Sequence, residues 1–432
     1  MNERNNIKII IDNDLCISCG GCTYACPFKK IVMKYNAQRG KWEAEVKDFK
    51  KCTRCYGEKN CLRVCPSYKV DYMKKAYSDK NRLLGNILKV YNGYSKDFET
   101  RNRSSSGGFI RELCKTLFKK KEIDGVISIS HVKGLDYEPN LIKDVSKMPN
   151  SIYHNINFEN AFRLLINNTG KFLIIGLPCQ LTSISLLSDM KKFLHLKDRI
   201  YAKVSLICGY IFDRISAEAF AYYNNIHLSE ISYRENGRFR KTRIFDDNKK
   251  SLVFNVLQPK SSNEFINNKI LSDRFLVQNG CLHCVDHLCY TADLVVGDAW
   301  QKRYQEDRIG TNIIIIRTDK GQRIINEIEN IYLEEGYIKE IIESQSELYA
   351  LGALGEAMNR LKISNNYFCP QHLRTTELNN LHIYKFKTKE ILKIRVVKKL
   401  LRKKRYLLAK NIYLLLHLRM FIIHSLQKLG KR

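Results

Sequence analysis

Between about residues 100 and 345, short apolar runs alternate with stretches that carry an apolar residue every three or four positions. The short runs predict buried strands, and the longer stretches predict amphipathic helices. The expected strands are 124–130, 171–177, 201–209, 293–297 and 312–317, and the expected helices are 108–121, 157–168, 179–190, 213–225 and 320–331. This alternation predicts an α/β fold, a mixed sheet with covering helices.

A different pattern fills residues 8–70, which hold eight cysteines at close spacing. Between two cysteine runs, the short apolar and aromatic segments 31–35 and 41–46 flank a turn that ends at Gly40, which predicts a small hairpin. We expect a separate domain at 1–75 whose stability depends more on bound metal than on a hydrophobic core.

The end of the chain is strongly basic. Residues 382–432 hold 16 Lys and Arg against one Glu, a net charge of +15, which is half of the +30 of the whole chain. Apolar positions such as Val397, Leu401 and Leu408 recur there at near-helical spacing, so a basic amphipathic helical tail is predicted at 385–432. The stretch 346–384 shows no clear periodicity and is expected to be a linking region.

Composition excludes several classes of protein. The 432 residues are 44% hydrophobic and 27% charged, which excludes wholesale disorder and fibrous repeats. No window holds the roughly 18 apolar residues of a spanning helix, and the N-terminal sequence lacks a signal-peptide pattern, so we expect a cytoplasmic protein.

The tail could dock peripherally on the anionic inner face of the membrane or be a solvated extension. Because it lacks a nucleic-acid-binding motif, no nucleic-acid partner is expected.

Fifteen cysteines in a long chain without an export signal indicate reduced thiolates that hold metal. The first run is Cys16-x2-Cys19-x2-Cys22-x3-Cys26-Pro27, and the second is Cys52-x2-Cys55-x5-Cys61-x3-Cys65-Pro66. Three close cysteines supply one face of a [4Fe-4S] cluster, and the fourth comes from the other run, as in two-cluster bacterial ferredoxins. One cluster is therefore assigned to Cys16, Cys19, Cys22 and Cys65, and the other to Cys52, Cys55, Cys61 and Cys26.

Two zinc sites would use the same eight thiolates. The third cysteine beside each pair and the Cys-Pro ending of both runs favour iron-sulfur clusters. The five residues between Cys55 and Cys61 are a departure from the bacterial ferredoxin spacing, where two are usual.

Four further cysteines could meet at one edge of the predicted sheet. Cys179 follows one expected strand, Cys208 ends another, and Cys281 and Cys284 form a Cys-x2-Cys pair. Strand ends of an α/β sheet converge on the edge where ligands bind, so these thiols could hold a third cluster. The alternative is that Cys179 or Cys208 is a buried apolar side chain.

A Ser- and Gly-rich segment, 104–108, leads directly into the helix expected at 108–121. Small residues expose backbone N–H groups at a helix N-terminus, which together with the helix dipole can bind a phosphate. Arg101 or Arg103 could add positive charge. The alternative is a simple helix cap.

Read in order, these pieces resemble the family of coenzyme F-420 hydrogenase/dehydrogenase beta subunits, preceded by a ferredoxin module. The likeness rests on the segments 104–109, 176–180, 208–209, 281–284, 292–294, 297–300 and 310–311. It is strongest to the bacterial branch found with polysaccharide biosynthesis proteins. The resemblance implies FAD and a third [4Fe-4S] cluster on Cys179, Cys208, Cys281 and Cys284. It also implies that FAD is contacted by Ser105, Ser106, Gly107, Gly108 and Gln180.

We therefore expect a 2[4Fe-4S] ferredoxin-type domain at 1–75 and a flavin- and iron-sulfur-binding oxidoreductase domain at 76–345. The protein would pass electrons between a ferredoxin-like partner, its clusters, FAD and a two-electron acceptor, which is a small molecule or a lipid- or sugar-linked compound. No catalytic residue is assigned. Two alternatives remain: a non-catalytic electron-delivery subunit of a larger complex, and a membrane-surface or interaction protein with structural clusters.

Overall fold

The structure of the chain is a computed structural model that describes residues 6–48, 59–68, 84–223, 225, 227–235, 237, 241–245, 251–255, 277–345 and 400. Cys52 and Cys55 lie outside the described residues. So do the linking region and the tail predicted at 346–432, apart from Leu400.

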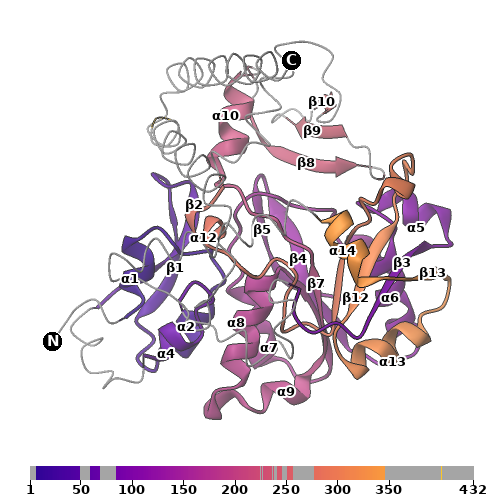
Figure 1. Ribbon diagram of the computed structural model, residues 1–432. Coiled ribbons are helices and arrows are strands. Elements are labelled where there is room, and N and C mark those ends of the chain that lie inside the picture. Colours follow the sequence, from indigo (N-terminus) through magenta and orange to yellow (C-terminus); the bar gives the residue numbers. More distant parts are fainter. Residues whose placement is uncertain are drawn as a thin grey trace, which may run out of the picture.

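An eight-stranded mixed sheet forms the centre of the molecule (Figure 1). Its strand order is β13-β3-β12-β11-β7-β6-β4-β5, in which β4, β6, β7 and β11 pair in parallel and the other pairs are antiparallel. The strands are β3 (Lys89–Ser95), β4 (Gly125–Lys133), β5 (Asp136–Ile142), β6 (Phe172–Gly176), β7 (Ile200–Leu206), β11 (Leu294–Asp298), β12 (Asn312–Ile316) and β13 (Ile331–Gly336).

Helices cover both faces of this sheet, because its central strands are apolar on both sides. In β6, Phe172 and Ile174 belong to one buried cluster, and Leu173 and Ile175 belong to the other. One face is covered by α6 (Phe109–Lys119) and α13 (Asp319–Glu327), and the other by α7 (Asn160–Asn167), α8 (Pro178–Ser188) and α9 (Leu196–Arg199). The predicted α/β fold is confirmed.

The cysteine-rich N-terminal part packs outside α7 and α8 (Figure 1). It consists of α1 (Lys8–Asp12), α2 (Gly21–Ala25), the hairpin β1 (Ile31–Asn36) and β2 (Lys41–Val46), and α4 (Asn60–Arg63). The predicted hairpin is present at this position, and Gly40 closes its turn with a φ of +63°.

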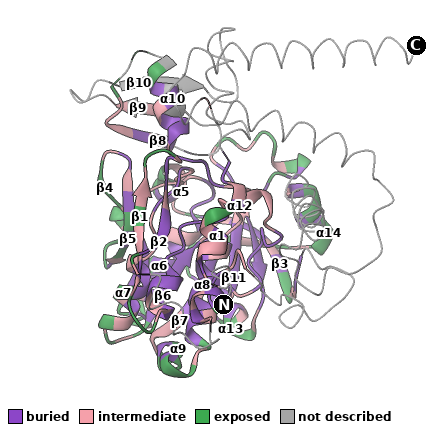
Figure 2. Ribbon diagram, turned by 90° about the vertical axis from the view of Figure 1, so that its left-hand side faces the viewer, coloured by how far each residue is buried: buried purple, intermediate pink, exposed green. Residues whose placement is uncertain are grey.

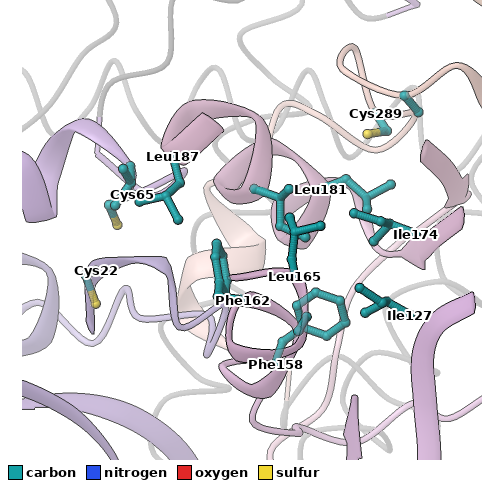
Figure 3. Close-up of a cluster of buried hydrophobic side chains, with 14 of the residues drawn as sticks. Cys22, Cys65, Ile127, Phe158, Phe162, Leu165, Ile174, Leu181, Leu187 and Cys289 are labelled. Atoms are coloured by element: carbon teal, nitrogen blue, oxygen red, sulfur yellow. The ribbon is translucent and has the colours of Figure 1, made fainter. Parts of the chain in front are cut away.

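This N-terminal part shares a hydrophobic core with the sheet. Figure 3 shows one continuous cluster that runs from Cys22 and Cys65, past Phe162 of α7 and Leu181 of α8, to Ile174 of the sheet. Burial against the α/β part therefore stabilises the cysteine loops in addition to any metal that they bind.

Three smaller pieces complete the described structure. A three-stranded antiparallel sheet, β10-β9-β8, lies beside α10. Its strands are β8 (Glu230–Glu235), β9 (Lys241–Phe245) and β10 (Ser251–Asn255). The remaining helices are α5 (Phe98–Arg103), α10 (Ile215–Tyr223), α12 (Asn279–Leu282) and α14 (Ile338–Ser344). Figure 2 shows α14 at the margin of the molecule, where exposed and buried residues alternate.

All five strands and five helices expected between residues 100 and 345 are present within a few residues of their predicted limits. The strands β3, β5 and β13 were not predicted. Polar residues interrupt their apolar pattern: Asn92 of β3 is buried and donates a hydrogen bond to Glu340 of α14 over 2.7 Å. Within the described part of the chain, no helix has the length and apolar character that crossing a bilayer requires.

Candidate functional site

The first predicted cluster site is assembled by two loops. Gly20, with a φ of +81°, turns the chain into α2, and this turn lies between Cys19 and Cys22, while Cys65 follows α4. Figure 3 shows Cys22 and Cys65 side by side at the end of the core cluster. The structure brings five thiols together here: those of the predicted ligands Cys16, Cys19, Cys22 and Cys65, and that of Cys61.

Burial controls the protonation of these thiols. Loss of hydration raises the pKa of Cys19 to about 11, and it raises the pKa values of Cys22 and Cys65 well above the ordinary value of 9.0. Repulsion among the neighbouring thiolates adds to the increase. Iron reverses this preference, because a metal ion deprotonates a thiol that coordinates it. The donor set therefore fits a [4Fe-4S] cluster.

Two glycines beside the first cysteine run lie in close contact with the α/β part. A Cβ atom on Gly20 would overlap the backbone of Glu159, and one on Gly21 would overlap the Ser183 hydroxyl. The glycines allow the ferredoxin-like loop to approach the helices of the α/β part closely.

For the second predicted cluster, the structure describes two of the four ligands. Cys26 follows α2, and Cys61 lies on α4. Both thiols are partly exposed, unlike those of the first group. Thiolates of Cys22 and Cys61 interact electrostatically, which puts Cys61 beside the first group.

The third group of cysteines converges at the edge of the central sheet, as the strand order requires. Cys179 lies in the first turn of α8 directly after β6, and Cys208 follows β7. Cys281 lies on the short helix α12, and the Cys284 thiol donates a weak hydrogen bond to the carbonyl oxygen of Asp286.

Electrostatic interactions show how close these thiols are. Loss of hydration raises the pKa of Cys179 well above its ordinary value, and four neighbouring thiolates raise it further. Those thiolates belong to Cys208, Cys281, Cys19 and Cys284. Because Cys19 is a predicted ligand of the first cluster, the first and third groups adjoin each other. Ser183 of α8 lies at this junction and donates a hydrogen bond to the Val64 carbonyl over 3.0 Å.

The donor chemistry of the third group also fits a cluster, since it offers four thiols beside one another in a site with little water. Among the described residues, no three His, Cys, Asp or Glu side chains converge as they would around a single metal ion. The sequence predicts no role for His283 or His287, and the Nδ1 atom of His287 lies 2.8 Å from the carbonyl oxygen of Cys208.

A cleft of about 240 Å³ opens at the carboxyl ends of the parallel strands. The ends of β4, β6, β7 and β11 supply its floor through residues such as Ile129, Gly176, Leu206 and Gly297. This edge is where open α/β sheets bind ligands, and the described residues of the cleft combine apolar walls with a few polar groups.

The Ser- and Gly-rich turn forms one wall of the cleft. Ser105, Ser106 and Gly108 line it, whereas Gly107 lies behind the wall, where a Cβ atom would overlap the Asn312 amide. Asn312 also accepts a hydrogen bond from the N–H of Phe109 over 3.2 Å. Helix geometry leaves the next two N–H groups of α6, those of residues 110 and 111, without an intrahelical acceptor, and both residues line the cleft.

The arginines suggested as phosphate ligands serve the fold instead. Arg101 stacks on the Tyr94 ring and pairs with Asp307 at 3.0 Å, and it supports the Ser- and Gly-rich turn from behind. Arg103 is exposed and pairs with Glu99.

The lining of the cleft also holds a charged pair that the sequence did not predict. Arg234 of β8 pairs with Asp298 at 2.6 Å and donates a hydrogen bond to the Tyr153 hydroxyl over 2.8 Å. All three residues line the cleft. Asp298 lies in one of the segments that carry the family resemblance, but no sequence pattern indicates Arg234 or Tyr153.

Two neighbouring residues of α8 face different sites. Cys179 belongs to the third cysteine group, and Gln180 lines the cleft. Gln180 also accepts a hydrogen bond from the Leu177 N–H over 2.8 Å, so its side chain caps the helix. Cys208 belongs to both sites, because it interacts with Cys281 and also lines the cleft. A cluster on the third group would therefore border any ligand in the cleft.

Comparison with known families agrees with this arrangement. The 4Fe-4S dicluster domain matches residues 8–66. The N-terminal and C-terminal segments of the coenzyme F420 hydrogenase/dehydrogenase beta subunit match residues 90–152 and 169–341. The chain belongs to this family of beta subunits. It is an iron-sulfur member of the family, with the dicluster domain in front of both family segments.

Two curated relatives are similar to this beta-subunit chain over most of its length. A subunit of the F(420)H(2) dehydrogenase of Methanosarcina mazei is 24% identical over 75% of this chain and 85% of its own length. The "Coenzyme F420-dependent sulfite reductase" of Methanocaldococcus jannaschii is 25% identical over 83% of this chain, which spans about half, 52%, of that relative. A "Ferredoxin" of Pyrobaculum islandicum is 35% identical over 60 residues, 14% of this chain and 47% of its own length.

One solved structure that aligns with this chain belongs to the F420-reducing [NiFe] hydrogenase complex of Methanosarcina barkeri. The alignment covers 66% of this chain and 93% of the solved one, with 17% identity and a TM-score of 0.48.

Proposed function

We propose that the chain is an iron-sulfur flavoprotein oxidoreductase that moves single electrons between its clusters and an FAD in the cleft. The observation that supports this function is the position of Cys208, which joins the third cysteine group to the wall of the cleft. A bound FAD would supply the conversion between single-electron transfer and hydride transfer to a two-electron acceptor.

The protein's own residues would bind and orient this cofactor. The third cluster would be held by Cys179, Cys208, Cys281 and Cys284, next to the first cluster on Cys16, Cys19, Cys22 and Cys65. The N-terminus of α6 offers partial positive charge to an anionic dinucleotide, and Arg234, whose charge Asp298 balances, offers N–H donors. Ser105, Ser106 and Gln180 offer hydrogen bonds from the walls.

The main test is the metal and flavin content of the protein purified without oxygen. Three filled [4Fe-4S] sites correspond to roughly twelve iron atoms per chain, together with one flavin. Cys281→Ser should lower the iron content by about a third, one cubane in three, while the clusters of residues 8–66 persist.

Cys289→Ser is the matched control for this substitution. Cys289 is a fully buried thiol only eight residues from Cys281, and it is outside the predicted ligand set. Its replacement should leave the iron content unchanged. Stoichiometric zinc in colourless protein, or equal iron loss in both variants, would contradict the proposed function.

A role as one subunit of a larger redox complex is the second candidate. It is favoured by the relative from Methanosarcina mazei, whose name describes it as part of a dehydrogenase. The two candidates differ in whether the isolated chain turns over a small molecule in a flavin-dependent reaction.

The acceptor can be tested by measuring which compound reoxidises the reduced protein. Reoxidation by coenzyme F420 would favour the family's deazaflavin chemistry, and reoxidation by a sugar- or lipid-linked acceptor would favour the predicted role in polysaccharide biosynthesis.

A further inference from the structure

A fully buried lysine lies beside the first cysteine group. Lys41, at the start of β2, has 0% of its surface exposed. Its ammonium group pairs with the Asp14 carboxylate at 2.7 Å and donates a hydrogen bond to the carbonyl oxygen of Cys16 over 3.0 Å. The positive charge is therefore fixed next to the backbone of a predicted cluster ligand.

The same carboxylate also contacts the helix that carries a ligand of the third group. Asn279 of α12 donates a hydrogen bond to Asp14 over 2.8 Å, two residues before Cys281. Figure 1 shows α12 close to β2, and Gly280 of α12 lies against Leu15 of the loop after α1. The Lys41–Asp14 pair thus lies between the loops that hold the two neighbouring groups of thiols.

Stability alone is a poor explanation for this pair. Removing an ammonium ion from water costs several kcal/mol, and a buried ion pair returns little net stability compared with apolar side chains of the same size. A fixed charge has a direct effect on a redox centre, however, because reduction adds a negative charge to the cluster. A nearby cation stabilises the reduced form, and a nearby carboxylate destabilises it.

We propose that Lys41 and Asp14 are positioning residues that set the reduction potential of the cluster held by Cys16, Cys19, Cys22 and Cys65. The proposal rests on the proposed function, since it requires that cluster. The pair would thereby control the driving force for electron transfer between the first and third clusters. Because the two charges are opposite, replacing Lys41 and replacing Asp14 should shift the reduction potential in opposite directions.

The test is a potentiometric titration of the full-length, anaerobically purified protein, followed by electron paramagnetic resonance. Lys41→Met should make the first cluster about tenfold harder to reduce, a shift of about −59 mV for one electron. Asp14→Asn should shift the potential in the positive direction. Lys41→Arg should keep the wild-type potential, and the double variant K41M/D14N should return towards it.

Lys34→Met is the matched control, because Lys34 lies on the same hairpin but is exposed and pairs with Glu45 at the surface. Water and salt screen an exposed charge, so this variant should leave the potential unchanged. The Cys65→Ser variant identifies the signal of the first cluster.

Three outcomes would overturn the proposal: equal shifts in Lys41→Met and Lys34→Met, shifts of the same sign in Lys41→Met and Asp14→Asn, or no shift in iron-loaded Lys41→Met. If Lys41→Met fails to load iron, the double variant and Asp14→Asn still decide the question. A wild-type protein without iron would instead refute the proposed function, which keeps the two failures distinguishable.

Discussion

At the scale of single residues, burial decides which groups of the site carry charge. Arg234 and Asp298 form an ion pair at 2.6 Å in the wall of the cleft, so each balances the charge of the other. His154, also in the cleft wall, has both ring nitrogens within hydrogen-bonding distance of a partner: Tyr233 Oη at 2.9 Å and the Leu135 carbonyl oxygen at 2.8 Å. An uncharged His154 ring can donate one hydrogen bond to the carbonyl oxygen and accept another from the tyrosine hydroxyl.

His154 should make the protein less stable as the pH falls. Burial lowers the pKa of His154 from the ordinary 6.5 to about 4. Between these values the unfolded chain binds a proton that the folded chain does not, so the free energy of unfolding decreases with falling pH. Between pH 7.5 and pH 6 the loss from this residue is roughly 1 kcal/mol.

The measurement is urea unfolding at both pH values for the wild type and His154→Gln. The variant should be less stable overall but should show a weaker pH dependence. His287, whose pKa is also lowered by burial, remains in both proteins, so the difference between them isolates His154. Identical pH dependence in both would show that His154 titrates normally in the fold.

At the scale of elements, residues of the third cysteine group and of the cleft lie at the same edge of the sheet. The turns after two of the parallel strands contribute to the sites: β6 leads to Cys179 and Gln180, and β7 leads to Cys208. The Ser- and Gly-rich turn before α6 supplies one wall of the cleft from the helix layer that covers one face of the sheet. Its geometry depends on Gly107, which has a φ of +55° and lies against Asn312 at the start of β12.

Gly107→Ala should therefore destabilise the protein and weaken flavin retention. The added methyl group adds left-handed strain and overlaps Asn312, and the cost is about 1–3 kcal/mol. Gly134→Ala is the matched control. Gly134 has a similar φ of +54°, but a Cβ atom there would approach only the Ser229 carbonyl oxygen, at 3.1 Å.

Thermal unfolding and flavin content after gel filtration would measure both effects. Gly134→Ala should lose some stability through strain but keep its flavin. Equal flavin loss in both variants would show that the Ser- and Gly-rich turn has no particular role in cofactor binding.

At the scale of the whole molecule, the ferredoxin-like part and the α/β part fold against each other. They share one hydrophobic cluster, and the contact between Gly21 and Ser183 brings the first cysteine group close to α8. In the proposed function, electron transfer between the first and third clusters would depend on this close approach.

Gly21→Ala should disturb the packing of the ferredoxin-like part against the α/β part and lower the free energy of unfolding, because its methyl group would overlap the Ser183 hydroxyl. Overpacking of this kind costs about 1–3 kcal/mol. Ser183→Ala alone should cost less, since it loses only the hydrogen bonds of one hydroxyl, with the Val64 carbonyl and with the Cys19 thiol. The double variant should be more stable than Gly21→Ala alone.

A double-mutant cycle on the free energy of unfolding would measure this coupling. Additive losses in the double variant would mean that the two side chains do not meet in solution. The rate of electron transfer from an external donor to the flavin should follow the same order as the stabilities if the contact sets the path.

The sequence alone determined which residues could bind a cluster and which segments form five of the eight strands of the central sheet. Cysteine spacing within one loop is a local property, and the continuous apolar run of a strand buried on both faces, such as β6, is also local, so both are visible in the chain. The family resemblance extended this to the third group, whose four members come from three distant segments.

Only the tertiary structure decided which groups adjoin one another. The proximity of Cys19 to Cys179, the position of Cys208 in the cleft wall and the Arg234–Asp298 pair all join segments far apart in sequence. The burial of Lys41 beside Asp14 and Asn279 is of the same kind. A lysine on a hairpin is usually solvated, and here its ammonium group is buried against Asp14 and the Cys16 carbonyl of the loop after α1, a relation that no local pattern encodes.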